Sequence, residues 1–187
     1  MNNETSNLVY LAMYAALAVV LDYVNQFIPF LQMPNGGSIN LALIPIFIAS
    51  YQLGWQKGVI SALLWWLLGL GLGLNNFMLS PLQVMLDYIL PAAVIGLASI
   101  FKDLGKVDRI YVGITISMLL KYLMHVLAGA IFWFPQGTAS GSGAAWAFSI
   151  SYNAWYNLAT YVVAIILVPL IIKRLHKTSR IKFKALD

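Results

Sequence analysis

The chain has 187 residues, of which 61% are hydrophobic and only 9% are charged, and its formal net charge is +5. A soluble domain carries roughly 25% charged residues, so this composition excludes an ordinary soluble domain and indicates an integral membrane protein. The chain has no cysteine, which excludes disulfide scaffolds, thiolate metal sites and cysteine nucleophiles. Its length suits one domain.

Six apolar runs follow one another along the chain, most of them long enough to cross a bilayer. They cover about residues 8–30, 39–53, 58–74, 81–101, 110–133 and 145–172. We therefore predict an all-α integral membrane protein whose single domain, residues 1–187, is a bundle of six transmembrane helices ending in a basic tail over 173–187. The first run lacks a basic leader and a cleavage site, so we expect no signal peptide.

The charged connections between these runs predict how the chain sits in the membrane. The loops at about 31–38, 75–80 and 134–144 have no charged residue. Ten of the eleven basic residues lie in the other connections and the tail: Lys57, Lys102, Lys106, Arg109, Lys173, Arg174, Lys177, Arg180, Lys182 and Lys184. The positive-inside rule then places both termini in the cytoplasm. We interpret the tail as a topology signal that contacts anionic lipid, and we expect no nucleic-acid binding.

A few strongly polar residues lie within the runs, where an ionisable group needs a partner or a function. They are Asp22, Asn40, Asp87, Lys121, His125 and Asn153. At ~1.5 Å of helical rise per residue, Asp87 lies about 9 Å from the outer end of its run. The same count puts Asp22, His125 and Asn153 at about 12 Å. These depths predict one polar layer in the outer half of the membrane.

Aromatic residues crowd the same layer. They include Tyr88, Trp133, Trp146, Phe148, Tyr152, Trp155 and Tyr156. Some of them suit an interfacial aromatic belt. Those turned toward Asp87 and His125 favour a binding site, because a buried carboxylate among flat π faces suits a cationic, planar ligand. His125 and Asn153 would add hydrogen bonds that orient its ring.

Two further features leave alternatives open. Lys121 shares a helical face with His125 near the membrane midplane. We interpret it as one half of a structural ion pair with Asp22 or Asp87, with a proton relay as the alternative. Ala12 and Ala16 are four residues apart, a spacing that lets another helix approach closely, either within the bundle or from a partner protein.

Motifs of enzymes are missing: the sequence has no P-loop, no zinc-protease motif and no nucleophile elbow. With two histidines and no thiols we expect no metal site and no cofactor. Uphill transport would then need an ion gradient or a separate ATPase. A chain of this length without inverted repeats suits a substrate-binding subunit better than a complete carrier. The alternative from another class is a stand-alone proton-coupled carrier that uses Lys121, His125 and Asp87 as a relay.

Four stretches together carry a resemblance to a known family. They are Met33–Ser38 with Ile44–Ile46, Pro81–Tyr88, Leu120–Trp133 and Ser149–Asn153. Over nearly its whole length the chain resembles the thiamine-specific S-components, the ThiT/YuaJ family, of energy-coupling factor (ECF) transporters. The resemblance implies a subunit of the bacterial plasma membrane that captures thiamine from outside and is not itself an enzyme. It also implies docking on an EcfT membrane subunit that carries two EcfA-type ATPase subunits.

By position, the family's ligand-binding residues fall on Asp87, Tyr88, His125, Trp133 and Asn153, and its EcfT-contacting motif falls on Ala12 and Ala16. Phe148 stands where the family has a tyrosine. Asn40 stands where some members have a glutamate, and a tryptophan before it is replaced in the region 35–37. These departures leave room for a related ligand, such as hydroxymethylpyrimidine.

Overall fold

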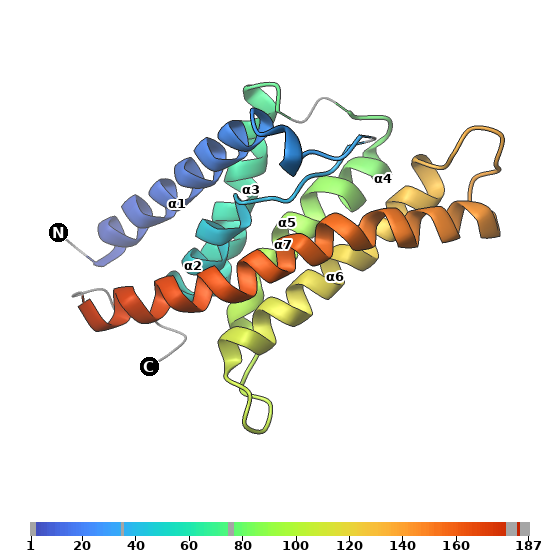
Figure 1. The fold of residues 1–187 in the computed structure, drawn as a ribbon. Helices are drawn as coiled ribbons and strands as arrows, with labels where there is room; N and C mark the ends of the chain where they lie inside the picture. The colour runs from blue at the N-terminus through green and yellow to red at the C-terminus, as the bar shows by residue number, and fades with distance from the viewer. Residues whose placement is uncertain (1–2, 35, 75–76, 179–182, 184–187) are drawn as a thin grey trace.

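The computed structural model describes residues 3–34, 36–74, 77–178 and 183, and in this part of the chain the regular structure is helical, with two isolated β-bridges and no strand (Figure 1). The elements are α1 (Asn3–Gln26), η1 (Pro29–Leu31), α2 (Leu43–Leu53), α3 (Trp55–Gly71), α4 (Pro81–Val84), η2 (Met85–Ile89), α5 (Leu90–Gly96), η3 (Ala98–Ile100), α6 (Arg109–Phe132) and α7 (Gly143–Thr178). The all-helical prediction is confirmed for this part of the chain.

Each predicted apolar run contains helix, with shifted ends. Among the described residues, four helical segments are long and apolar enough to cross a membrane: Glu4–Gln26, Pro81–Ile100, Arg109–Phe132 and Gly143–Lys177. The fourth predicted run is the composite of α4, η2, α5 and η3. Helix α2 has 11 residues, which is too short for a full crossing, and α3 has 17, which is at the lower limit of about 17 to 25 residues. The count of six crossings therefore stays a prediction.

Local chemistry explains where several helices begin and end. Gly54 separates α2 from α3 with φ of +90°, a backbone conformation that side chains other than glycine rarely adopt. Helix α6 begins after Asp108, whose carboxylate accepts from the backbone N–H of Ile110 at 2.8 Å. In the preceding loop, hydrogen bonds from the Arg109 backbone N–H and guanidinium lower the pKa of Asp103.

Helix α2 lies at the centre of the bundle. Nearly every one of its residues is buried, and the side chains of Phe47 and Tyr51 have no exposed surface. Helix α3 packs against α1, α2 and α5, while α6 packs along α7 and α5. Tyr14 of α1 donates a hydrogen bond to Gln52 of α2, which ties α1 to this core.

Helices α3 and α5 cross with almost no side chain between them. A Cβ atom on Gly58 would lie 2.5 Å from the Gly96 carbonyl oxygen, and one on Gly96 would lie 2.5 Å from the Val59 nitrogen. The same carbonyl accepts from Ser50 Oγ of α2 at 2.6 Å. Small residues of this kind let helices approach closely where lipid supplies no hydrophobic drive.

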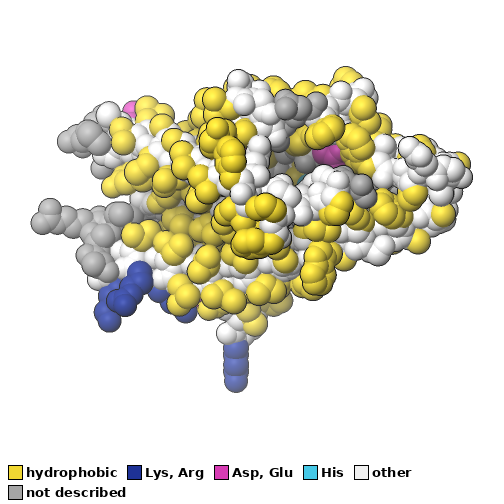
Figure 2. Space-filling view, turned by 45° about the horizontal axis from the view of Figure 1, so that its top comes forward, with side chains coloured by type: hydrophobic (Ala, Val, Ile, Leu, Met, Phe, Trp, Pro, Cys, Tyr) yellow, Lys and Arg dark blue, Asp and Glu magenta, His cyan; other side chains and the backbone are white. Residues whose placement is uncertain are grey.

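The outer surface is apolar over most of the face in Figure 2. The basic side chains visible there lie at one end of the molecule and on a part that projects from its lower edge. Such a surface suits contact with lipid. The basic tail is described in part: Lys173, Arg174 and Lys177 end α7, whereas Arg180, Lys182 and Lys184 lie outside the described residues. The start of α1 and the end of α7 lie at the same side of the view in Figure 1, and the α6–α7 loop lies at the other.

Candidate ligand-binding site

Two adjoining cavities lie among α1, α3, η2, α6 and α7. The first, about 490 Å³, we call the polar chamber; residues that line it alone include Asp22, Asn25, Gln26, Ser38, Asn40, Trp65, Trp66 and Lys121. The second, about 450 Å³, we call the aromatic chamber; residues that line it alone include Gly129, Trp133, Phe148, Ser149, Tyr152 and Asn153. Both are lined by Gly36, Gly37, Phe77, Asp87, Tyr88, His125 and Tyr156, which we call the shared wall. Volumes of this size suit a small organic ligand.

A turn of π-helix presents Asp87 and Tyr88 to this wall. Pro91 has no backbone N–H, so it cannot make the α-helical hydrogen bond to the carbonyl of Asp87. The chain widens here into η2, in which the N–H of Leu90 bonds the carbonyl of Met85, five residues earlier. π-Helical turns inside α-helices occur frequently at functional sites.

The Asp87 carboxylate is held by two donors on one of its oxygens. Trp133 Nε1 donates to Asp87 Oδ2 at 2.7 Å, and Gln83 Nε2 donates to the same oxygen at 2.7 Å. Asp87 Oδ1 takes no hydrogen bond from the described residues. The carboxylate is thus fixed in orientation, with one oxygen available for a ligand in the cavity.

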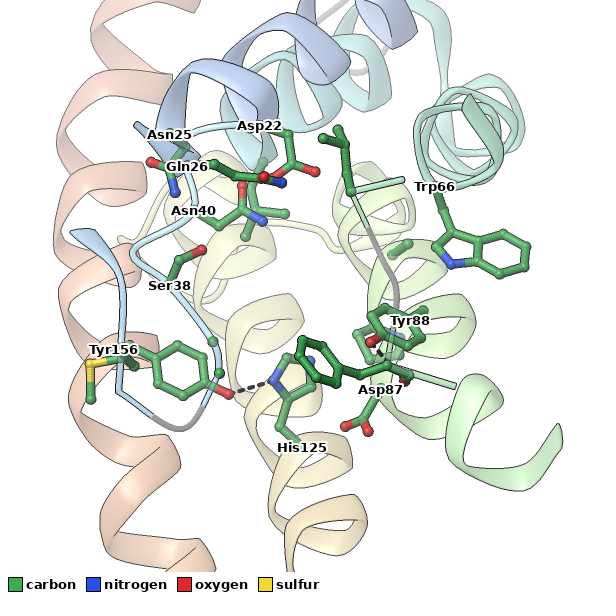
Figure 3. Close-up of a pocket in the computed structure, with 18 of the residues that line it drawn as sticks. Asp22, Asn25, Gln26, Ser38, Asn40, Trp66, Asp87, Tyr88, His125 and Tyr156 are labelled. Atoms are coloured by element: carbon green, nitrogen blue, oxygen red, sulfur yellow. Dashed lines mark hydrogen bonds between the residues drawn. The ribbon is translucent and has the colours of Figure 1, made fainter. Parts of the chain in front are cut away.

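A hydrogen-bonded chain crosses the opposite side of the site. His125 Nδ1 lies 2.8 Å from the Tyr156 hydroxyl, the contact drawn as a dashed line in Figure 3. That hydroxyl donates to Asn153 Oδ1, and the Asn153 amide nitrogen donates to the Ser149 carbonyl at 2.9 Å. The chain fixes the rings and amides that would orient a ligand.

Lys121 does not form the predicted ion pair with Asp22 or Asp87 in the described part of the chain. Lys121 Nζ instead donates to Asn157 Oδ1 at 2.7 Å and lies over the Tyr156 ring at 5.6 Å. Among the described residues no ion pair joins Lys121 to Asp22 or Asp87. The buried ammonium group of Lys121 is thus bound by an amide on the polar face of α7 and not by a carboxylate.

Asp22 and Asn40 lie on the α1 side of the polar chamber, as Figure 3 shows. Trp65 Nε1 donates to Asp22 Oδ2 at 3.1 Å. Asn40 Oδ1 accepts from the backbone N–H of Ala42 at 2.8 Å, and the backbone N–H of Asn40 donates to Thr160 Oγ1 at 3.1 Å. Asn40 therefore also fastens the start of α2 to α7.

The predicted polar layer is divided between the two chambers. Asp87 and His125 line both, Asn153 lines the aromatic chamber, and Asp22 lines the polar chamber. Ala12 and Ala16 lie apart from the site, with their side chains exposed on α1.

Two contributors were missed as site residues in the sequence analysis. Gln83 holds Asp87 from one helical turn away, a four-residue spacing that the sequence displays. Tyr156 joins His125 to Asn153, and it was noted only as one of several aromatic residues. The signal was the run Asn153, Asn157 and Thr160, which places a buried polar stripe on the face of α7 that also carries Tyr156.

An apolar helical bundle that encloses cavities with fixed polar groups has the features of a membrane protein that binds a small ligand. A family model described as "Thiamine transporter protein (Thia_YuaJ)" matches residues 8–180. The thiamine transporter ThiT of Bacillus subtilis is 34% identical over 184 residues, covering 91% of this chain and 92% of the relative. The thiamine transporter ThiT of Lacticaseibacillus paracasei is 29% identical over 174 residues, covering 84% and 82%.

The solved structure of ThiT from Listeria monocytogenes superposes with a TM-score of 0.74 at 26% identity, covering 94% of this chain and 98% of that one. The chain belongs to the thiamine transporter (Thia_YuaJ) family. It is therefore a multi-pass membrane transport protein and not an enzyme.

Proposed function

We propose that this chain is the substrate-binding S-component of an ECF-type importer and that it captures thiamine. The observation that carries the proposal is the Asp87 carboxylate, which lies between two chambers with one oxygen free and aromatic rings around it. Thiamine joins a planar aminopyrimidine to a cationic thiazolium ring. A fixed carboxylate beside π faces stabilises such a cation by charge and by cation–π contact.

The aromatic chamber suits the aminopyrimidine. Phe148 and Tyr152 stack with ring centroids 5.4 Å apart, and Trp133 stands beside Phe77 at 6.4 Å, so flat rings bound this space. His125 and Asn153 supply the polar groups that read the ring's nitrogens. Asp87 and Tyr88, on the shared wall, then face the thiazolium.

The proposed assembly places Ala12 and Ala16 of α1 against an EcfT subunit that carries two EcfA-type ATPases. Both alanines are exposed and four residues apart, so they form a smooth strip on the outside of the bundle. The proposal includes six crossings of the bacterial plasma membrane, with both termini and the basic tail in the cytoplasm.

A second candidate ligand is hydroxymethylpyrimidine, the uncharged half of thiamine. Asn40 favours it, because an amide there adds no negative charge to the polar chamber and its oxygen is engaged by Ala42. Phe148 also offers no hydroxyl to the ligand. The two candidates differ in the cation that Asp87 would face.

Calorimetric titration of the purified chain with thiamine and with hydroxymethylpyrimidine separates them. We expect tighter binding of thiamine, and we expect Asp87→Asn to weaken it about tenfold to a hundredfold, the usual effect of a hydrogen bond to a charged group. Asp103→Asn is the matched control, since Asp103 lies in an exposed loop and pairs with Arg109. Unchanged thiamine affinity in Asp87→Asn would refute the charge-pairing role, and preference for hydroxymethylpyrimidine would change the assigned ligand.

A further inference from the structure

The carboxylate of Asp22 has a free oxygen inside the polar chamber. Trp65 Nε1 donates to Oδ2, and Oδ1 takes no hydrogen bond from the described residues. Figure 3 shows Asp22 near Gln26 and Asn40, on the side of the chamber away from Asp87. A carboxylate oxygen at membrane depth without a donor indicates a site that a ligand group or water completes.

Trp66 gives an independent sign of a missing partner in the same chamber. Its Nε1 is buried and has no hydrogen-bond partner among the described residues, although the Trp66 side chain lines the cavity. Figure 3 shows Trp66 on α3, across the chamber from Asp22. A buried indole N–H is normally paired, so this donor also points to an acceptor brought by a ligand or by a bridging water.

The charges that line the polar chamber favour a hydroxyl group over an anion. Asp22 and Asp87 both line it, and Lys121, the one lysine among its described lining residues, donates to Asn157. An alcohol donates to a carboxylate in a strong, charge-assisted hydrogen bond and can accept from an N–H at the same time. A phosphate in the same place would meet two carboxylates, which disfavours it by like-charge repulsion.

We infer that the polar chamber is a second subsite, which binds the hydroxyalkyl end of the ligand and selects against its phosphate ester. Asp22 accepts the hydroxyl proton, and Trp66 donates to the hydroxyl oxygen directly or through one water. The inference rests on the proposed function. It also follows the order of the groups in thiamine. With the aminopyrimidine in the aromatic chamber and the thiazolium at the shared wall, the hydroxyethyl arm extends into the polar chamber.

Three ligands test the assignment: thiamine, its monophosphate, and an analogue with an ethyl group in place of the hydroxyethyl arm. We expect the unaltered chain to bind thiamine more tightly than either of the others. In Asp22→Asn, thiamine affinity should fall about fivefold to thirtyfold, as expected for one charge-assisted hydrogen bond. Affinity for the ethyl analogue should stay the same, and the gap between thiamine and its monophosphate should narrow.

Trp66→Phe supplies a second variant, which keeps the ring and removes only the N–H. Thiamine binding should weaken about threefold to tenfold, with no loss for the ethyl analogue. Equal changes for all three ligands, or none, would overturn the subsite while leaving thiamine capture intact. Failure of the unaltered chain to bind thiamine would overturn both proposals. Thermal unfolding of each variant shows that the chain remains folded.

Discussion

Asp87 and Trp133 are 46 residues apart in the chain, and their side chains share a hydrogen bond of 2.7 Å between Trp133 Nε1 and Asp87 Oδ2. The bond links the π-helical turn to Trp133, the residue that follows the end of α6. It fixes a charged group and an aromatic ring relative to one another, which is the pairing that a planar cation requires.

Trp133→Phe should weaken thiamine binding about threefold to tenfold, because Asp87 loses one of its two donors while the aromatic face is kept. Calorimetry on the purified chain measures the change. Trp155→Phe is the control, since Trp155 is 67% exposed and lines neither chamber. Equal effects of the two substitutions would mean that the Trp133 N–H has no specific role.

Tyr156→Phe should lower thiamine affinity about fivefold or more, because its hydroxyl contacts both His125 and Asn153. The same titration measures it. Tyr161→Phe is the matched control: the Tyr161 hydroxyl contacts Thr115 outside both chambers. Retention of full affinity in Tyr156→Phe would show that the hydrogen-bonded chain does not orient the ligand.

Ala12→Trp should abolish thiamine uptake by cells and leave thiamine binding by the purified chain unchanged, since a bulky ring blocks close helix approach on the exposed face of α1. Leu119→Trp, at an exposed position on α6, should leave both unchanged. Uptake assays with labelled thiamine distinguish the two. Continued uptake in Ala12→Trp would place the docking surface elsewhere.

The purified chain alone, reconstituted in vesicles, should not accumulate thiamine when a pH gradient is imposed. The reason is that Lys121 is engaged by Asn157 and so does not form an ion pair with either carboxylate of the cavity. Accumulation without ATP and without partner subunits would instead establish a proton-coupled carrier. Lys121→Met would then be expected to stop it.

Gly96→Ala should destabilise the fold by about 1–3 kcal/mol, because its methyl group would meet the backbone of α3 at the glycine crossing. Gly71→Ala is the control, since nothing lies within 4 Å of a Cβ atom there. It should be neutral or slightly stabilising. Thermal unfolding midpoints in detergent compare them, and equal midpoints would contradict the close crossing.

Helix positions were largely predictable, because apolar runs and helices coincide. The ends were less so: the first run was expected to continue to residue 30, but α1 ends at Gln26 and a separate turn follows. The π-helical turn at Asp87 was not predicted, although Pro91 is its visible cause. Lys121 was expected to pair with a carboxylate, but among the described residues it donates to the neutral amide of Asn157, on a neighbouring helix whose rotation the sequence does not state.

The sequence by itself determined the membrane class and the approximate positions of the helices. It also predicted a depth for each polar residue, because helical rise converts residue number into distance along an axis. Tertiary structure decided which of those residues meet. Asp22 and Asn153 were placed at equal depth, yet they line different chambers, since depth says nothing of rotation about an axis or of which helices are neighbours. Close packing at sites such as Gly58 and Gly96 decides which helices are neighbours.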